Sequence, residues 1–502
     1  MENLNISEVV TNSFNKFLCE NKVEYPKLTR DLISKWNFEK EIENEYKISN
    51  ENTLNALPSL NSLNSNESKP QIIKALLTVQ NVIENQLYLS ARYNKNKKTY
   101  EINKYFENVS ENEMLNDEYD NDETLLNDRL ALECRDIPGL NPKISSLYPS
   151  LCTPSKIIVY DYSNSHSKLN EIILVVGAAY RKSDSVVVIH AWNITNQFIE
   201  KMIPRISPPV NENGYKDLNS LMNITFCGDE LSKEYAILFI FSQIFNRVGQ
   251  KNIGSFPLNY FTNKNVTKYH LKFLDLLKKI GIFVLDQKVT ISELNSKRFY
   301  PRYDIEKEVL ETGEFQCCDK TYLVIDESEM NEGKLEDFGV KNFATLKNII
   351  DFQTINYEYP YNNIEMPHDI EICIFSCNKS IFVSPFLCCV PIEESICEEN
   401  EDIIHNQNVI DSAFYYVNKI KFNQEFTNEF KISKELCDLI NKDYMSLHKN
   451  DFNIDLFDLI MRLARIRAIS QNRKELTFDD YARIRDLEQI RLKRLNAIKT
   501  NK

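Results

Sequence analysis

The stretch Leu323-Val324-Ile325-Asp326-Glu327 decides the fold class of this chain, because it is an apolar strand that ends in two acids. A second continuous apolar run of strand length spans residues 370–376, and helical patterns occupy residues 269–280 and 343–352. Apolar strands that alternate with helices are typical of a mostly parallel sheet covered by helices. The sequence therefore predicts a mixed α/β protein.

The same acidic strand end is the arrangement of a Walker B motif, in which the Asp holds Mg²⁺ and the Glu orients water. An ATPase also needs a glycine-rich loop whose backbone amides bind phosphate, followed by a Lys. Segment 249–255 has two glycines at that spacing but no Lys after Gly254, and segment 228–233 has one glycine and two acids. We therefore expect no ATP hydrolysis and no cofactor.

Other catalytic patterns are weak. The sequence contains no Gly-x-Ser-x-Gly and no His-Glu-x-x-His motif. Cys373 and Cys377 would face one side of a predicted strand, which favours core positions over metal ligands. His190 ends an apolar run beside Trp192, which favours a hydrogen-bonded structural histidine. We expect neither catalytic residues nor a metal site.

Length and composition set the class of protein. At 502 residues, about three domains are expected. Lys and Arg number 60 against 73 Asp and Glu, a net charge of -13, whereas general nucleic-acid and membrane-surface binders have the opposite sign. The first residues contain no apolar run, so we expect no secretory signal; the chain also has no apolar run near the ~20 residues of a membrane helix and no Cys-x-x-Cys among 12 cysteines. We expect a soluble intracellular protein with protein partners.

The periodicity predicts six parts. Residues 5–48 have helical spacing, whereas 72–79, 86–93 and 99–102 are short β-prone runs, the last after a turn at 95–98. A small antiparallel sheet or barrel is expected there, with an OB-like fold as one candidate among several. The predicted parts are 1–110 (helical plus barrel-like), 111–130 (acidic linker), 131–205 (β-rich), 206–392 (α/β core), 393–410 (acidic loop) and 411–502 (helical).

The C-terminal part is the most basic, and two interpretations of it stay open. Thr477 and Asp480 have the spacing of a capping box at the start of a helix. Two helices with a short turn permit a helix-turn-helix or winged-helix module that binds DNA. Pairing of the charges within the chain is favoured instead, since no aromatic or Asn/Gln recognition cluster accompanies them. The pairs expected are Asp479–Arg483, Asp480–Arg483 and Glu488–Arg491. The basic residues are Arg462, Arg465, Arg467, Arg473, Lys474, Arg483, Arg485, Arg491, Lys493 and Arg494.

Residues 333–380 resemble the MCM-binding protein family, whose members associate with minichromosome maintenance (MCM) helicase subunits. The similarity extends to 228–245, to 257–261 and into the C-terminal helices. The positions that carry it as candidate site residues are Asp326, Glu327, Gly333, Gly339, Asn342, Gln353, Tyr357, Pro367 and Ser376. Further matching positions are Leu335, Val340, Leu346, Ile350, Tyr361, Glu365, Ile370 and Ser380.

The resemblance implies a relative of the MCM fold that has lost its nucleotide machinery: a barrel-containing front, a degenerate AAA+-like α/β core without a P-loop, and a helical tail. It implies a non-enzymatic nuclear protein that binds MCM subunits and supports DNA replication, through helicase assembly, protection or unloading, and sister-chromatid cohesion. Asp326 and Glu327 would then be relics or structural acids. The alternatives are an ATP-binding AAA+-like factor and a replication factor that binds DNA through its basic C-terminal helices.

Overall fold

The structure is a computed structural model. It describes residues 6–21, 36, 57–63, 70–102, 119–150, 156–162, 167–196, 199–206, 213–249, 251–393, 401–423, 425–447 and 454–500. The chain divides into two compact units: Met1–Ile137 with Ser145–Gln197, and Pro138–Ile144 with Phe198–Lys502.

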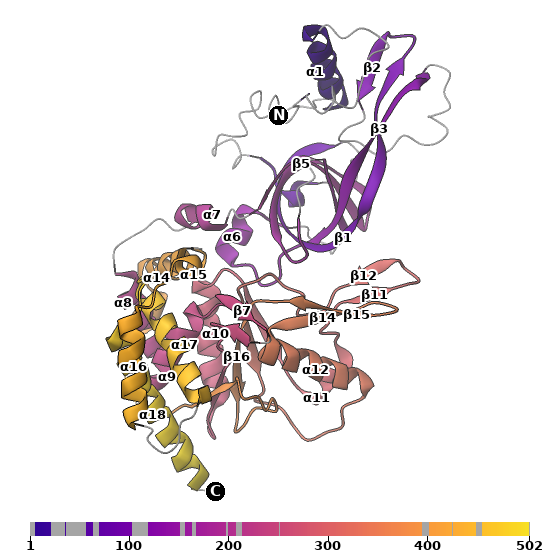
Figure 1. The fold of residues 1–502 in the computed structure, drawn as a ribbon. Coiled ribbons are helices and arrows are strands. Elements are labelled where there is room, and N and C mark those ends of the chain that lie inside the picture. The colour runs from indigo at the N-terminus through magenta and orange to yellow at the C-terminus, as the bar shows by residue number, and fades with distance from the viewer. Residues whose placement is uncertain are drawn as a thin grey trace. The chain divides into compact units, whose positions relative to one another are not determined.

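The first unit is built on a closed five-stranded barrel (Figure 1). Its strands are β1 (Gln71–Asn94), β3 (Tyr119–Arg135), β4 (Lys156–Asp161), β6 (Val186–Asn196) and β5 (Ile172–Ser183), in that order around the barrel. Strand β5 pairs back with β1 and closes it. The pairs are antiparallel except β4 with β6, which is parallel. The short β2 (Thr99–Ile102) pairs with the end of β1.

The barrel differs from the sequence prediction in three ways. It takes strands from both the part predicted at 1–110 and the β-rich part predicted at 131–205, which belong to one unit. The runs at 72–79 and 86–93 are one continuous strand, which bends at several irregularities in its pairing with β3. The predicted acidic linker is wrong from residue 119 onward, because that part belongs to β3; residues 103–118 lie outside the described residues. Strand β3 tolerates its acids because pairing with β1 satisfies the backbone while side chains such as Asp128 stay exposed.

Two apolar clusters stabilise the first unit. Inward-facing residues of all five strands fill the barrel, among them Ile73, Leu132 and Ile189. A second cluster joins Phe14 of α1 (Ile6–Glu20) and Trp36 to residues such as Trp192 of β6. Helix α1 confirms the helical spacing at its residues, whereas most of the predicted helical region up to 48 lies outside the described residues. The 3-10 helix η1 (Leu60–Ser62) also belongs to this unit.

A five-stranded parallel sheet forms the centre of the second unit. In spatial order its strands are β10 (Val284–Lys288), β13 (Thr321–Asp326), β16 (Ile370–Ser376), β9 (Leu258–Phe261) and β17 (Cys388–Pro391). All residues of β9, β13 and β16 are buried. The predicted parallel sheet with continuous apolar strands is therefore confirmed.

Helices pack against this sheet (Figure 1). Helix α9 (Glu230–Phe241) is buried at ten of its twelve residues, which confirms the apolar helix predicted at 230–245, although it ends four residues early. Helix α10 (Val266–Ile280) contacts β13 and β16. The other helices before the tail are α6 (Pro142–Leu147), α7 (Ile199–Ile206), α8 (Gly214–Thr225), α11 (Ile291–Ser296) and α12 (Asp337–Phe352).

A second, four-stranded sheet, which the sequence did not predict, is inserted between strands of the first. Its order is β12 (Val309–Glu311), β11 (Arg302–Asp304), β14 (Thr354–Glu358) and β15 (Asn363–Pro367). Strands β11 and β14 are parallel, and the other pairs are antiparallel hairpins. A separate small hairpin consists of β7 (Asn246–Val248) and β8 (Lys251–Ile253).

The C-terminal helices pack into the same core as the parallel sheet. One cluster of buried apolar residues runs from α8 through the sheet to the last helices, and the buried Lys421 ammonium lies 2.8 Å from the Glu371 carboxylate of β16. The predicted helical tail is present but shares this core, so it is not a separate module. Among its described residues the only β pairing is an isolated bridge from Lys431 to Glu475, so no winged-helix hairpin forms there. The helices are α13 (Glu401–His405), α14 (Gln407–Lys421), α15 (Glu425–Asn428), α16 (Lys434–Leu447), α17 (Ile454–Ser470) and α18 (Phe478–Thr500).

None of the helices in the described ranges combines the length and the apolar character that crossing a membrane requires.

Candidate functional site

The acids Asp326 and Glu327 lie at the carboxyl ends of the parallel strands, where ligands of open α/β sheets bind. Asp326 is the last residue of β13, and its carboxylate accepts a hydrogen bond from the Ser328 amide at 2.9 Å. Glu327 follows it and is almost fully buried. The next strand ends in Ser376, whose hydroxyl is hydrogen-bonded at 3.1 Å to the side chain of Asn259 on β9.

Both oxygens of the Glu327 carboxylate are engaged by the loop after β16. One accepts a hydrogen bond from the Ser380 hydroxyl at 2.9 Å, and the other accepts one from the Ile381 amide at 3.2 Å. Burial raises the pKa of the Glu327 carboxyl to about 7. The side chain therefore holds this loop against the sheet, which is a structural use of the acid.

The loop after β9 occupies the place of a phosphate-binding loop, since it joins a strand of the sheet to the start of α10. It consists of Thr262-Asn263-Lys264-Asn265 and contains no glycine. Asn265 caps α10 by accepting a hydrogen bond from the Lys268 amide at 3.2 Å. Such a short loop lacks the run of backbone amides that cradles a triphosphate.

The two glycine segments weighed from the sequence lie elsewhere. Gly249 is in the turn of the β7–β8 hairpin, and Gly228 precedes α9 with a positive φ of 81°. Neither follows a strand of the parallel sheet. Sequence reasoning could not find the relevant loop, because only the strand order shows that β9 lies next to β16 and one strand away from β13.

The motif residues on α12 connect that helix to its surroundings. Asn342 is buried; its side-chain oxygen accepts a hydrogen bond from the Phe299 amide at 3.0 Å, and its amide donates to the carbonyls of Leu294 and Lys297. At Gly339 a Cβ atom would lie 2.0 Å from the Asn295 side-chain oxygen, so a larger residue would displace this side chain, whose oxygen accepts a hydrogen bond from the Glu336 amide.

The other motif residues divide between interior and surface. Gln353 ends α12 in the left-handed conformation, and its side-chain oxygen accepts a hydrogen bond from the Ile370 amide at 2.9 Å, which joins α12 to β16. Tyr357 is fully buried on β14. Pro367 and Gly333 are exposed. The structure thus brings Asp326, Glu327 and Ser376 to one sheet edge and places the rest around α12.

The cysteines and the histidine weighed from the sequence belong to different units of the chain. Cys373 is buried in β16, but Cys377 lies beyond the end of that strand, so the two do not share a strand face as predicted. Nδ1 of His190 lies 2.6 Å from the hydroxyl of Tyr162. Burial, with the nearby Arg129, lowers the pKa of His190 well below its ordinary value. Over the described residues, no group of three or more His, Cys, Asp or Glu could hold a metal ion.

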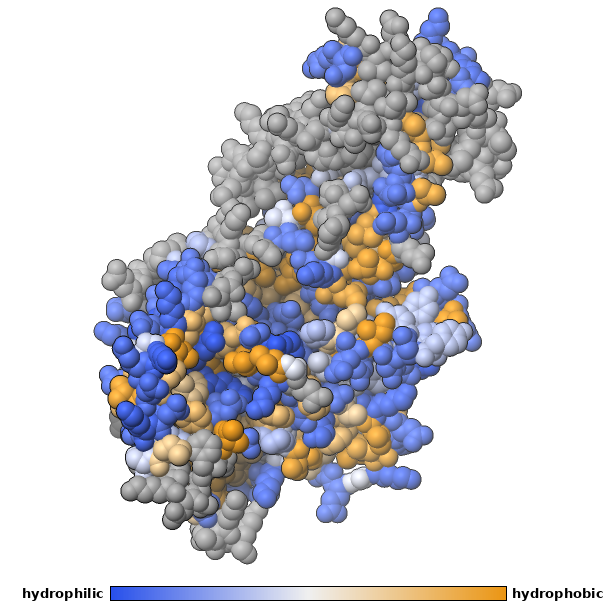
Figure 2. Space-filling view, viewed as in Figure 1, coloured by the Kyte–Doolittle hydropathy of each residue, from blue (hydrophilic) through white to orange (hydrophobic). Residues whose placement is uncertain are grey.

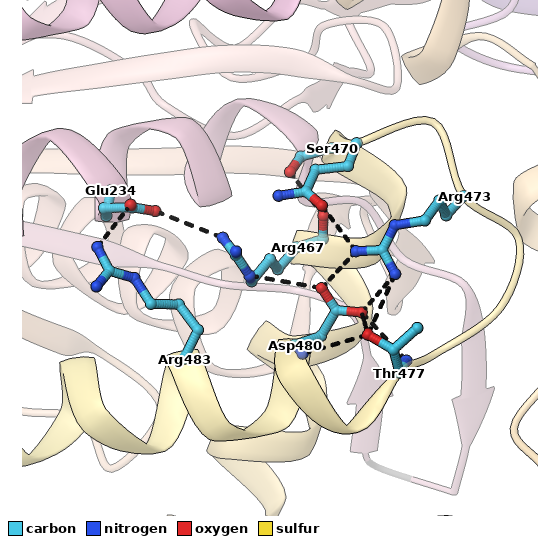
Figure 3. Close-up of polar contacts among 8 residues, drawn as sticks. Glu234, Arg467, Ser470, Arg473, Thr477, Asp480 and Arg483 are labelled. Carbon is cyan, nitrogen blue, oxygen red and sulfur yellow. Dashed lines mark hydrogen bonds and ion pairs between the residues drawn. The ribbon is translucent and has the colours of Figure 1, made fainter.

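At the start of α18 the predicted capping box is confirmed (Figure 3). The Asp480 amide donates to the Thr477 hydroxyl at 3.4 Å, and the Thr477 amide donates to the Asp480 carboxylate at 3.1 Å. The same carboxylate receives two hydrogen bonds from Arg473, at 2.6 and 2.7 Å. Burial alone would raise the pKa of Asp480, but these hydrogen bonds outweigh it and hold the pKa below its ordinary value.

The predicted ion pairs are partly wrong. Glu488 pairs with Arg491 at 2.6 Å, as predicted, and its carboxylate also accepts a hydrogen bond from the Tyr235 hydroxyl of α9. Arg483, however, pairs with Glu234 of α9 at 3.0 Å rather than with Asp479 or Asp480 (Figure 3). Helix α18 packs along α9, which brings these distant charges together.

Most of the basic residues of the tail are paired with acids of the same chain. The ones in ion pairs are Arg462, Arg467, Arg473, Lys474, Arg483, Arg485, Arg491 and Arg494. Arg465 instead lies over the rings of Phe245 and Phe430. Charges held in this way are less available for phosphate contacts, which favours the interpretation of internal pairing.

Comparison with known proteins identifies the family of this chain. Residues 185–495, more than half of the chain, match the family described as "Mini-chromosome maintenance replisome factor". The chain belongs to this family. The match includes the acidic strand end, α12 and the C-terminal helices.

Individual members of the family are distant in sequence. The mini-chromosome maintenance complex-binding protein of Arabidopsis thaliana is 24% identical over 398 residues, which cover 70% of this chain and 66% of the relative. That of Gallus gallus is 26% identical over 306 residues (59% and 47%), and that of Homo sapiens is 25% identical over 314 residues (60% and 47%). The matched part of the chain spans about half to two thirds of the length of these relatives.

Proposed function

We propose that this protein binds MCM helicase subunits in the nucleus, without enzymatic activity, and that it supports DNA replication and sister-chromatid cohesion. The observation that carries the proposal is the edge of the parallel sheet, where Glu327 serves a structural purpose and the loop after β9 lacks glycine. A member of this family whose sheet edge lacks a phosphate-binding loop can associate with MCM subunits without hydrolysing ATP.

The finer fold assignment is part of the same proposal. The barrel has five strands, closed by β1 and β5, with one parallel pair, which supports an OB-like fold. The parallel sheet, with an acidic strand end and a strand–loop–helix unit in P-loop position, supports a degenerate AAA+-like core. Assembly, protection and unloading of the helicase are three cellular roles that the same binding event can serve.

The test is light scattering after gel filtration, on the protein alone and mixed with MCM subunits from the same source, singly and in pairs. We expect a stoichiometric complex whose mass and stability are unchanged by ATP and by Asp326→Ala. Failure of every subunit to bind a monodisperse sample would contradict the proposal.

Two further measurements address the alternatives. Nucleotide binding that Asp326→Ala abolishes would favour an ATP-binding factor. DNA affinity that depends on the C-terminal helices and falls steeply with salt would favour a DNA-binding factor. The ion pairs of the tail lead us to expect no such DNA affinity, and the loop after β9, which contains no glycine, leads us to expect no such nucleotide binding.

A further inference from the structure

Strand β15 lies at the edge of the second sheet. Within the part of the chain that the structure describes, it pairs with β14 alone. Asn363, Ile364, Glu365 and Pro367 are exposed, and Tyr361 at the tip of the hairpin is 98% exposed. An open strand edge is a template on which another extended segment can add as a strand.

The hairpin geometry shows which backbone groups are free for such pairing. The Tyr359 amide donates to the Asn362 carbonyl at 3.0 Å, and at the other end the His368 amide donates to the Gln353 carbonyl at 2.8 Å. In an antiparallel ladder, opposite residues that exchange such hydrogen bonds alternate with residues that do not. Tyr359–Asn362 and Gln353–His368 are therefore both hydrogen-bonded pairs. In the register of the hairpin, one regular alternation of hydrogen-bonded and non-hydrogen-bonded pairs connects them.

It follows that the backbone groups of Ile364 and Met366 point toward β14, and those of Asn363, Glu365 and Pro367 point outward. Pro367 agrees with this assignment, because an outward position on an edge strand needs no amide hydrogen. The edge therefore offers the amides of Asn363 and Glu365 and three carbonyl groups.

A cleft of about 550 Å³ adjoins this edge. Thr354, Asn356, Glu365 and Pro367 line it from one face of the β14–β15 hairpin. The β7–β8 hairpin and the end of α12 supply the other lining residues, including Arg247, Asn252 and Asn348. A strand added to β15 would direct every second side chain toward this face.

Free polar groups in the cleft suit an extended peptide. The side-chain amides of Asn348 and Asn356 make no hydrogen bond to the described part of the chain, and each can donate to and accept from a peptide. By contrast, the guanidinium of Arg247 is already bound, since it donates to Asn252 at 2.8 Å and to the His368 carbonyl at 3.0 Å.

The remaining charge of the site is negative. The Glu365 carboxylate is exposed and accepts one hydrogen bond, from the Thr354 hydroxyl at 2.6 Å. The other acid of this hairpin, Glu358, is already paired with Lys341 at 3.0 Å, so Glu365 is the acid that remains for a partner. In Figure 2, pale and orange residues lie among the hydrophilic ones in this part of the surface. A basic partner segment complements this charge.

We propose that β15 binds an extended, basic segment of an MCM subunit, which adds to the sheet as a strand and places a Lys or Arg against Glu365. The identity of the partner rests on the proposed function; the edge, the cleft and their charge do not.

The test compares Glu365→Pro with Glu365→Gln in binding to the MCM subunit identified by light scattering. Proline removes both the charge and the outward amide hydrogen and leaves the pairing with β14, whereas glutamine removes only the charge. We expect about threefold weaker binding for Glu365→Gln, from one lost exposed charge contact, and about tenfold for Glu365→Pro, which also loses a hydrogen bond. Glu306→Gln, at an exposed acid of the neighbouring hairpin, is the matched control and should bind as the wild type does.

Hydrogen exchange on the wild-type complex keeps the test independent of how the variants fold. The amides of Asn363 and Glu365 should exchange fast in the free protein and slow down in the complex. A stoichiometric complex with no protection there, or with full affinity for Glu365→Pro, would overturn the strand-addition proposal alone. Absence of any complex with the wild type would overturn the proposed function as well. Self-association of the protein that Glu365→Pro abolishes would make a second copy the occupant and reject the proposal.

Discussion

The hydroxyl of Ser380 donates a hydrogen bond to the carboxylate of Glu327 at 2.9 Å, at the edge of the sheet where a related ATPase would activate water. The contact joins the end of β13 to the loop that leads into β17. The acid of the Walker-B-like strand is therefore occupied in holding the protein's own backbone.

Stability should depend on pH through Glu327. Burial raises the pKa of this carboxyl from 4.5 to about 7, so the folded protein holds a proton there that the unfolded chain has lost. The favourable contribution is fully present below pH 4.5 and is lost as the pH rises through 7. Glutamine does not ionise, so Glu327→Gln does not lose this contribution as the pH rises. The free energy of unfolding of the variant minus that of the wild type should therefore rise by up to about 3 kcal/mol between pH 5 and pH 8.

Urea denaturation at the two pH values measures this difference. Glu332→Gln, at an exposed acid of the following loop, serves as the control and should run parallel to the wild type. If Glu327→Gln also runs parallel, the buried carboxyl does not titrate in this range.

Asp480→Asn should destabilise the second unit by about 3 kcal/mol, because it weakens a buried, doubly hydrogen-bonded pair with Arg473 and the helix cap at Thr477. Asp479→Asn removes the same charge from the same helix turn at an exposed position, and should change stability by less than about 0.5 kcal/mol. Denaturation midpoints of the two variants give the comparison, and equal effects would show that only the helix dipole matters.

Arg491→Ala should cost about 3–5 kcal/mol, since it leaves the Glu488 carboxylate buried without its cation. Lys493→Ala, two residues further along α18 and exposed, should be nearly neutral. Thermal unfolding separates the two. If Arg491→Ala and Lys493→Ala change stability equally and both lower the affinity for DNA, the two residues instead belong to a nucleic-acid-binding surface.

Asn342→Ala should destabilise the protein by about 3 kcal/mol, because the Phe299 amide and the carbonyls of Leu294 and Lys297 lose their partner. Asn348→Ala is the control on the same helix, since its side chain lines the cleft without a hydrogen bond to any described residue and its loss should leave the free energy of unfolding unchanged. A small effect of Asn342→Ala would mean that water replaces all three contacts.

Several features followed from local sequence alone. The apolar runs that became β13 and β16, the buried helix α9 and the capping box of Thr477 and Asp480 are confirmed. Each is set by residues within a few positions of one another, so its periodicity or spacing is visible without a partner. The family resemblance on residues 333–380 was also carried by the sequence, and the family match confirms it.

Other features were decided by tertiary structure. Strand β3 begins within an acidic stretch because β1 pairs with it, and the four-stranded sheet arises from short polar strands that show no apolar run of their own. Arg483 has its partner, Glu234, on α9, and Arg494 pairs with Asp229, 265 residues away along the chain. Local patterning specifies which side chains are buried, whereas the partner of a charge or of a strand edge depends on which distant element the fold brings beside it.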